Sequence, residues 1–202
     1  MRLGVAGVSR ETRAALSRYV ELLLRWNRSL NLISSKDEHD IWRRHIDDSL
    51  QLLPLMPPSL DRAIDLGTGA GFPGLILALV SGVPFDLIES DKRKAAFLRQ
   101  AARVTGAAVQ VHAVRAESTQ IPPARLITAR AVAPLPRLLG LAAPFLKPDG
   151  ICLLLKGARV EPELTHAAAE WHMHVERIPS RTDASGCILR ISELGRATPS
   201  GD

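Results

Sequence analysis

The chain has 202 residues, of which 46% are hydrophobic and 23% are charged, as in a soluble globular protein and unlike a disordered one. This length suffices for one well-buried domain with an appendage and is short for two independent domains. The net charge of +5 leans moderately toward polyanionic partners, but charge alone does not identify a ligand because many basic proteins bind none.

Two amphipathic segments open the chain. Apolar residues recur at a helical period over residues 9–30, with arginines between them, which predicts a first helix. Ser35 and Glu38 then have the spacing of a capping box, and the apolar period that follows stops at Pro54. This pattern predicts a second helix followed by a break.

Beyond residue 60, short apolar runs alternate with helical patterns, which predicts βα units and a mostly parallel sheet with helices on both faces. The expected strands are residues 62–66, 85–90, 109–114, 126–129 and 151–156, followed by an antiparallel pair at 174–178 and 187–191. Pro73 stands where a helix would begin, and Gly82 and Gly106 stand where two helices would end. The sequence therefore predicts an α/β fold with seven strands.

Cysteine usage and apolar runs indicate the compartment. Cys152 and Cys187 lie inside apolar runs, and no disulfide framework or metal-ligand spacing such as CxxC appears. We therefore expect a reducing cytoplasm and no metal site. The N-terminal apolar stretch is too short for a signal peptide, and the run LILALVSGV is about half of the ~20 residues that a membrane span needs.

The segment DLGTGAGFPG places glycines at alternate positions between the first predicted strand and the helix that begins near Pro73. Gly67, Gly69 and Gly71 permit positive φ angles and close approach of a ligand, and the helix start presents unpaired amides to an anionic group. The spacing is not the dinucleotide fingerprint, because the third glycine falls one place early, and no Lys-Ser or Lys-Thr follows as in a P-loop. The turn predicts a site for a small, partly negative ligand, and tight packing without a ligand is the alternative.

The spacing DxGxGxG resembles the first motif of the S-adenosylmethionine-dependent methyltransferases. This resemblance implies that the turn, with Asp65, Gly67 and Gly69, carries the methionine end of the cofactor. It also implies that an acidic residue closing the second strand accepts the two ribose hydroxyls. Glu89, at the end of FDLIE, is the candidate because a carboxylate forms charge-assisted hydrogen bonds with them. Asp91 is the alternative.

Six segments in order make the resemblance more specific: RWNRSLNLIS, RHIDDSL, DLGTGAGFPG, ESDKRKAAFL, VRAE and TARAVAPL. Together they look like the RsmG (GidB) family, the 16S ribosomal RNA guanine-N7 methyltransferases, over most of the chain from about Trp26 to Gly157. One departure is Leu75-Ile76 after Gly74, where the family often has Ile-Pro. Because this change is apolar and lies beyond the glycine turn, we expect it to alter helix packing and not ligand choice.

The family resemblance implies a Rossmann-like class I methyltransferase that uses S-adenosylmethionine. The implied acceptor is a guanine in the 530-region loop of small-subunit RNA, and the product is 7-methylguanosine. We expect an N-terminal helical extension at residues 1–58 packed on the core, a methyltransferase domain at 59–193 and a disordered tail at 194–202. The expected partner is 16S rRNA or the small ribosomal subunit, including an assembly intermediate, and the expected state is a cytoplasmic monomer.

The resemblance also assigns residues to the site by their positions in the motifs. Phe72 lies in the cofactor loop, Ala116 and Glu117 border the adenine, and Arg130 stands at the end of the fourth strand, facing cofactor and substrate. The planar fork of Arg130 suits the O6 edge of guanine or the cofactor carboxylate, and a structural salt bridge is the alternative. Phe72 is also a candidate for stacking on a splayed base.

The expected contacts with substrate RNA are Asn31, Arg43, His45, Lys92 and Arg93. A helix-capping role explains Asn31 nearly as well, and a buried, hydrogen-bonded pair with Asp48 explains His45 nearly as well. For the basic clusters, a solvated helix face is the alternative, since only several clusters that converge on one rim indicate binding.

The proposed chemistry agrees with the residue types. Guanine N7 is a lone-pair nucleophile without a proton, so methyl transfer needs alignment more than a general base. TARAVA stands where exocyclic-amine methylation commonly uses an Asn-Pro-Pro-aromatic motif, and neither cysteine follows a proline, as the thiol for pyrimidine carbon 5 usually does. The remaining alternatives are a methyltransferase of the same fold acting on a small molecule or protein, and a non-catalytic RNA-binding protein that keeps the glycine turn.

Overall fold

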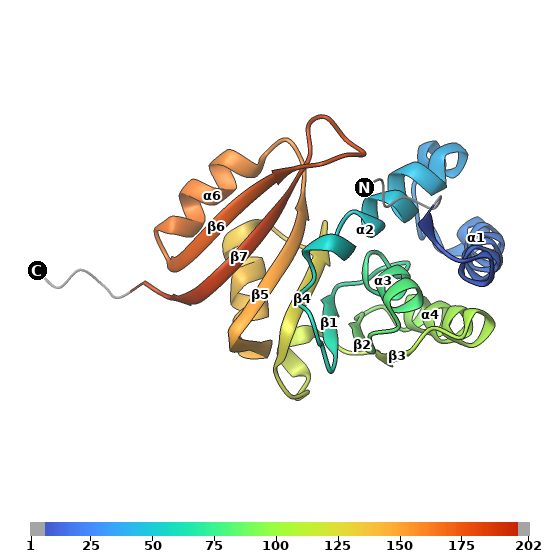
Figure 1. Ribbon diagram of the computed structural model, residues 1–202, viewed down its shortest axis with the longest axis horizontal. Coiled ribbons are helices and arrows are strands. Elements are labelled where there is room, and N and C mark those ends of the chain that lie inside the picture. The colour runs from blue at the N-terminus through green and yellow to red at the C-terminus, as the bar shows by residue number, and fades with distance from the viewer. Residues whose placement is uncertain (1–6, 198–202) are drawn as a thin grey trace, which may run out of the picture.

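The computed structural model describes residues 7–197 and contains one seven-stranded sheet with helices on both faces (Figure 1). The strands are β1 (Ala63–Leu66), β2 (Phe85–Ile88), β3 (Val109–His112), β4 (Ala124–Arg130), β5 (Leu146–Lys156), β6 (Trp171–Pro179) and β7 (Cys187–Arg196). The longer helices are α1 (Arg10–Leu30), α3 (Gly74–Ser81), α4 (Lys92–Thr105), α5 (Leu135–Ala142) and α6 (Val160–Ala168). The order is β3-β2-β1-β4-β5-β7-β6, and β7 runs antiparallel to β5 and β6.

This topology confirms the predicted α/β fold class and the antiparallel pair at its end. Strand boundaries differ by a few residues: β3 stops at His112, and β5 begins at Leu146, five positions before its expected start. The predicted tail is wrong at its beginning, because β7 extends to Arg196, which pairs with Trp171. Residues 198–202 of that tail lie outside the described part of the chain, and the division at residue 58 stays a prediction.

The central strands are apolar on both faces because each face is covered by helices. Leu126 and Leu153 belong to a core that includes residues of α1, α3 and α4, whereas Ile127 and Cys152 belong to a second core with α5 and α6. Successive side chains of a strand point to opposite faces, so neighbours in sequence separate into the two cores. Such strands form continuous apolar runs, as a buried parallel sheet requires.

The first predicted helix is confirmed as α1. Its N-cap is Ser9, whose hydroxyl accepts a hydrogen bond from the Thr12 amide at 3.1 Å. Asn31 ends the helix in the left-handed conformation (φ 47°), which asparagine tolerates better than most residues. Asn31 therefore caps the helix, and its contact with RNA stays a prediction.

The second predicted helix is wrong as a single α-helix. Its range holds the 3-10 turn η2 (Ser35–Asp40), the π-helical turn η3 (Trp42–Asp47), one α-turn, α2 (Asp48–Leu50), and the 3-10 turn η4 (Leu53–Leu55). The capping box does not form, because the Glu38 carboxylate instead accepts a hydrogen bond from Asn27 Nδ2 at 2.6 Å. No helix within residues 7–197 combines the length and apolar character of a membrane span.

Candidate functional site

The three glycines of the turn between β1 and α3 differ in how much space surrounds them. A Cβ atom on Gly67 (φ +59°) would lie 2.7 Å from a Val132 methyl carbon, and one on Gly71 (φ +102°) would lie 2.9 Å from Leu75 Cβ. A Cβ on Gly69 (φ +58°) would meet no atom nearer than 4.0 Å. Packing therefore excludes side chains at two of the positions, and the third faces open space, where a ligand can approach the main chain.

Asp65 supports this turn from beneath. Its fully buried carboxylate accepts hydrogen bonds from Thr128 Oγ1 at 2.6 Å and from the Gly74 amide at 3.1 Å. Burial raises the pKa of Asp65 to about 6, against these hydrogen bonds, which lower it. The structure corrects the predicted role: Asp65 ties β1 to β4 and to the start of α3, and it has no exposed surface with which to contact a ligand.

Glu89, directly after β2, lies against the open glycine. Its Oε2 accepts a hydrogen bond from the Gly69 amide at 2.9 Å, and its Oε1 accepts one from the Asp91 amide at 2.8 Å. Since each carboxylate oxygen has two acceptor sites, both oxygens keep capacity for a ligand. Asp91 instead caps α4, where its Oδ1 accepts hydrogen bonds from the Arg93 and Lys94 amides, and these bonds lower its pKa. The geometry favours Glu89 over Asp91 as the ligand-binding carboxylate.

Tyr19, the only tyrosine of the chain, braces the glycine turn from α1. Its fully buried hydroxyl donates a hydrogen bond to the Ala70 carbonyl at 2.5 Å, and its ring meets Phe72 edge-on at 5.7 Å. Desolvation raises the pKa of Tyr19 well above its ordinary value. This contact was not predicted from the sequence, although a lone tyrosine on the apolar stripe of a helix indicates a buried hydroxyl that needs a partner.

Phe72, in the glycine turn, stacks with the side chains of His45 and Arg130. The His45 ring lies parallel to the Phe72 ring with centroids 4.8 Å apart, and the Arg130 guanidinium carbon lies 4.9 Å from the Phe72 centroid. Only 3% of Phe72 is exposed. Phe72 is in the loop as predicted, but the expectation that its ring stacks on a base is wrong, because the ring is already packed on His45 and Tyr19.

Arg130, the last residue of β4, is held by one nitrogen. Its Nη1 donates to Asp48 Oδ2 and to the Arg44 carbonyl, both at 3.1 Å, and a fifth of its side chain is exposed. Among residues 7–197, Nε and Nη2 of Arg130 have no hydrogen-bond partner. The salt-bridge alternative is therefore correct for Nη1. Nε and Nη2 keep their hydrogen-bond donors for a ligand.

His45 is buried and neutral. Its two ring nitrogens have no hydrogen-bond partner among the described residues, and the nearest carboxylate oxygen, Asp37 Oδ2, is 3.7 Å away. Burial and the neighbouring Arg130 charge lower the pKa of His45 to about 4. The alternative for His45, a hydrogen-bonded pair with Asp48, is wrong, because Asp48 Oδ2 accepts its hydrogen bond from Arg130.

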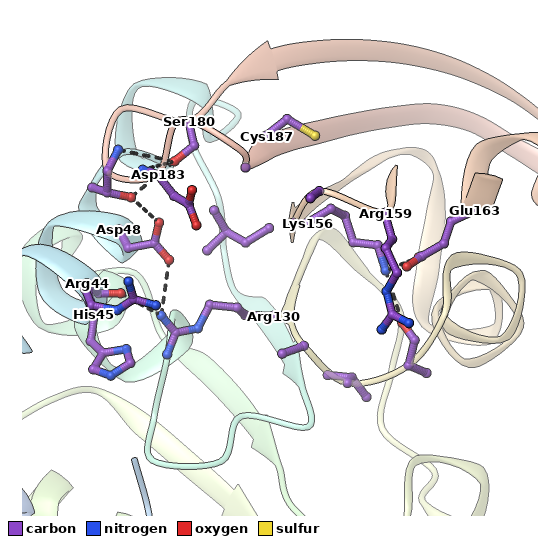
Figure 2. Close-up of a pocket in the computed structure, with 18 of the residues that line it drawn as sticks. Arg44, His45, Asp48, Arg130, Lys156, Arg159, Glu163, Ser180, Asp183 and Cys187 are labelled. Atoms are coloured by element: carbon purple, nitrogen blue, oxygen red, sulfur yellow. Dashed lines mark hydrogen bonds and ion pairs between the residues drawn. The ribbon is translucent and has the colours of Figure 1, made fainter. Parts of the chain in front are cut away.

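A cavity of about 720 Å³ opens beside this stack, at the carboxyl ends of β4 and β5 (Figure 2). Four separate stretches of the sequence line it: residues 44–48, residues 130–134, residues 155–163 and the β6–β7 loop from residue 180. Its charged lining residues are Arg44, Asp48, Arg130, Lys156, Arg159, Glu163 and Asp183. Val132 lines the cavity and also lies against Gly67, so the cavity adjoins the glycine turn.

The other predicted site residues lie around these features. Ala116 and Glu117 form part of the turn η5 (Ala116–Ser118) after β3, and the Glu117 carboxylate lies 3.9 Å from Arg137 of α5. Arg43 is exposed and donates to the Thr182 carbonyl at 2.7 Å. Lys92 and Arg93 are exposed in the first turn of α4 and do not line the cavity. In the described part of the chain, no group of three or more His, Cys, Asp or Glu side chains is placed to hold a metal ion.

Comparison with known proteins identifies the family. Residues 12–185 match the model of the GidB family, described as rRNA small subunit methyltransferase G. The chain belongs to this family. "Ribosomal RNA small subunit methyltransferase G" of Gluconobacter oxydans (strain 621H) is 53% identical over 189 residues, which cover 94% of this chain and 97% of that protein. The protein of the same name from Rhodospirillum centenum (strain ATCC 51521 / SW) is 54% identical, covering 93% of this chain and 87% of its own length.

Solved structures of low sequence identity share the fold of this GidB-family chain. An O-methyltransferase from Bacillus cereus in complex with SAH superposes with a TM-score of 0.59 at 16% identity, covering 86% of this chain and 90% of that chain. A putative O-methyltransferase from Klebsiella pneumoniae gives a TM-score of 0.58 at 14% identity, covering 87% and 88%. These similarities confirm the predicted class I methyltransferase fold.

Proposed function

We propose that this chain transfers the methyl group of S-adenosylmethionine to N7 of a guanine in the 530-region loop of 16S ribosomal RNA, giving 7-methylguanosine. Its place in the GidB family and the name of its relatives support an rRNA substrate. The observation that carries the proposal is that Glu89 and Arg130 both contact the glycine turn beside one large cavity. A cofactor seated on the turn would face a nucleotide in that cavity.

The residues around the turn fit this cofactor. Gly69 leaves open space above the main chain, and Glu89 keeps free acceptor sites for two ribose hydroxyls. The methionine end would approach the main chain at Gly69, whereas Gly67 packs against Val132. Ala116 and Glu117 border the adenine. When bound, the cofactor supplies an electrophilic methyl group.

Arg130 and the cavity position the acceptor base. Arg130 has donors free for guanine O6, and this contact would hold N7 for attack without a general base. His45 is neutral at pH 7 and buried, so it serves as a packing wall and not as a proton acceptor. Burial raises the pKa of Cys152 to about 12, which argues against the thiolate that carbon-5 methylation requires.

The RNA backbone would contact the basic face beside the site. Helix α4 has the sequence KRKAAFLRQAARVT, with no Asp or Glu, and it begins next to Glu89, so its exposed Lys92 and Arg93 lie on the cofactor side. Arg43 stands at the cavity rim through its bond to the β6–β7 loop. We propose that the protein acts as a cytoplasmic monomer on 16S rRNA or the small subunit, including an assembly intermediate.

The test is transfer of labelled methyl groups to small subunits, naked RNA and total protein, followed by nucleoside analysis. We expect label in 7-methylguanosine of small-subunit RNA. Label only in protein or small molecules would refute the RNA assignment and favour a different substrate for the same fold. No binding of S-adenosylmethionine in calorimetric titration of folded protein would refute every enzymatic interpretation.

Two pairs of variants test the assigned residues. Glu89→Ala should weaken cofactor binding by about tenfold or more, since it removes hydrogen bonds to a charged group worth roughly 1.5 to 3 kcal/mol. Asp91→Ala is the control, because Asp91 caps α4.

Lys92→Ala should raise the KM for RNA and reduce its salt dependence. Lys147→Ala, at the opposite end of the parallel strands, should leave both unchanged.

A further inference from the structure

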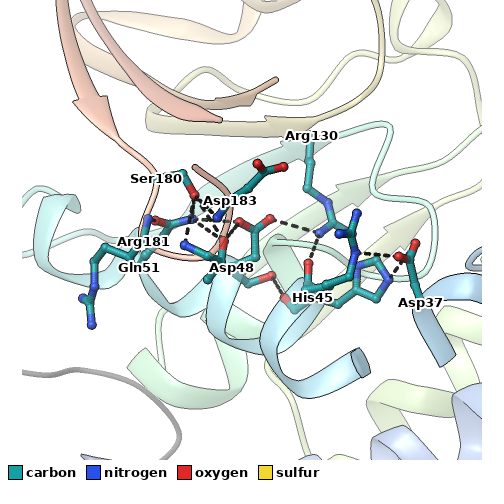
Figure 3. A network of polar contacts seen from close by, with 11 residues as sticks. Asp37, His45, Asp48, Gln51, Arg130, Ser180, Arg181 and Asp183 are labelled. Atoms are coloured by element: carbon teal, nitrogen blue, oxygen red, sulfur yellow. Dashed lines mark hydrogen bonds and ion pairs between the residues drawn. The ribbon is translucent and has the colours of Figure 1, made fainter. Parts of the chain in front are cut away.

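The β6–β7 loop lies against the N-terminal segment (Figure 3), and both segments line the cavity. Thr182 of this loop donates its hydroxyl proton to Asp48 Oδ1 at 2.5 Å, across 134 positions of sequence. The neighbouring Ser180 hydroxyl lies 3.1 Å from the Thr182 hydroxyl. A loop side chain that the predicted site did not include therefore contacts the carboxylate that binds Arg130.

The Asp48 carboxylate is bound through both oxygens. Oδ1 accepts hydrogen bonds from Thr182 and from Gln51 Nε2 at 2.8 Å, and Oδ2 accepts the bond from Arg130 Nη1. Only 14% of the Asp48 side chain is exposed, so water competes weakly for these bonds. A carboxylate fixed on one side presents its other oxygen in a fixed direction, and that direction sets where the Arg130 guanidinium lies.

The loop itself is tied down, so the Thr182 hydroxyl is not a mobile contact. The Arg181 amide donates to Gln51 Oε1 at 2.9 Å, and Arg43 Nη1 donates to the Thr182 carbonyl at 2.7 Å. These main-chain bonds, one on each side of the Thr182 side chain, hold it over Asp48. The loop therefore holds the Asp48 carboxylate in place, and this carboxylate in turn holds Arg130.

We propose that Thr182 is a positioning residue for methyl transfer, acting through Asp48 to orient the free donors of Arg130 toward the acceptor base. The inference rests on the proposed function of Arg130. Because alignment of the reacting atoms governs a transfer that uses no general base, loss of this orientation lowers kcat. Cofactor affinity is unaffected, because Thr182 makes no bond to the glycine turn or to Glu89.

The kinetic test compares three variants of the full chain. Thr182→Val keeps the side-chain shape and removes the hydroxyl, and we expect kcat on small-subunit RNA to fall about tenfold with an unchanged Kd for S-adenosylmethionine. Thr182→Ser restores the hydroxyl and should restore kcat. Ser185→Ala is the control, since among residues 7–197 the Ser185 hydroxyl bonds only to Asp183, in the same loop. Wild-type kcat in Thr182→Val, or equal defects in Thr182→Val and Thr182→Ser, would overturn the proposal.

A second measurement does not depend on the substrate. Nitrogen-15 NMR of the side chains reports how fast the Arg130 guanidinium rotates, and the Arg130→Lys variant assigns its signals. We expect slow rotation in the wild type and in Thr182→Ser. Rotation should be faster in Thr182→Val. If wild-type protein methylates no ribosomal RNA while the Arg130 signals respond in this way, the proposed function fails and the Thr182 contact stands. Identical Arg130 signals in all variants would refute the contact itself.

Discussion

The buried imidazole of His45 predicts a loss of stability on mild acidification. Its pKa is lowered from 6.5 to about 4 in the folded protein, chiefly by burial. Between these values the unfolded chain binds a proton that the folded chain does not, so the free energy of unfolding falls as the pH falls. Since one pKa unit is worth about 1.36 kcal/mol, this group should remove about 2 kcal/mol of stability between pH 7 and pH 5.

His45→Phe isolates this contribution. A phenyl ring keeps the stacking on Phe72 and needs no hydrogen-bond partner, which suits a site where both ring nitrogens of His45 lack one. Asp65, whose pKa is raised to about 6, loses its contribution as the pH rises through the same window. Because Asp65 is present in both proteins, its effect cancels in the difference between them.

The assay is urea unfolding of wild type and His45→Phe at pH 7 and pH 5, with the exposed His39→Phe as the control for loss of a histidine. We expect the stability of His45→Phe relative to wild type to increase by about 2 kcal/mol at the lower pH. The same difference at both pH values would show that His45 takes up its proton without hindrance in the folded state. That result would refute its burial as a neutral ring beside Arg130.

Two further substitutions test the glycine turn. Gly67→Ala should destabilise the fold more than Gly106→Ala: both have left-handed backbone, which costs about 1 to 2 kcal/mol for alanine, but only at Gly67 does the new methyl group meet Val132. Equal losses in urea unfolding would show that Val132 moves aside at no cost. Tyr19→Phe should lower the free energy of unfolding by about 1 to 3 kcal/mol, since it leaves the buried Ala70 carbonyl without its donor. Unchanged stability would mean that water replaces the hydroxyl.

Features fixed by neighbouring residues were predictable from the sequence. The glycine turn, the start of α1 at Ser9 and the seven strands follow from patterns a few residues long, and the structure contains all of them. Glu89 was assigned because the family resemblance places an acidic residue at the end of the second strand, which is a local signal, and its contact with a ligand stays a prediction. The error on Asp65 has the same origin: the motif marks the residue, but whether its carboxylate faces a ligand or Thr128 is decided by the register of β1 on β4.

The segment after α1 was predicted less well because long-range contacts decide its conformation. The Glu38 side chain bonds to Asn27 in place of its own helix start. The short turns η3 and α2 then place His45 against Phe72 and Asp48 against Arg130. Apolar spacing alone cannot distinguish these turns from an α-helix. The support of Asp48 by Thr182 has no sequence signal, since a threonine in a polar loop is ordinary turn composition.

The two halves of the site should therefore respond differently to substitution. The proposed cofactor half is made of contacts between the ends of adjacent strands, with Glu89 and Gly69 separated by 20 positions. The proposed substrate half joins Asp48 to Arg130 over 82 positions and to Thr182 over 134, so it draws on both the N-terminal segment and the β6–β7 loop. Substitutions in these outer segments should lower kcat while leaving cofactor affinity intact, whereas substitutions at Glu89 should do the reverse. A loop variant that weakened cofactor binding as strongly as it slowed transfer would show that the two halves are coupled through Phe72, the ring that touches both.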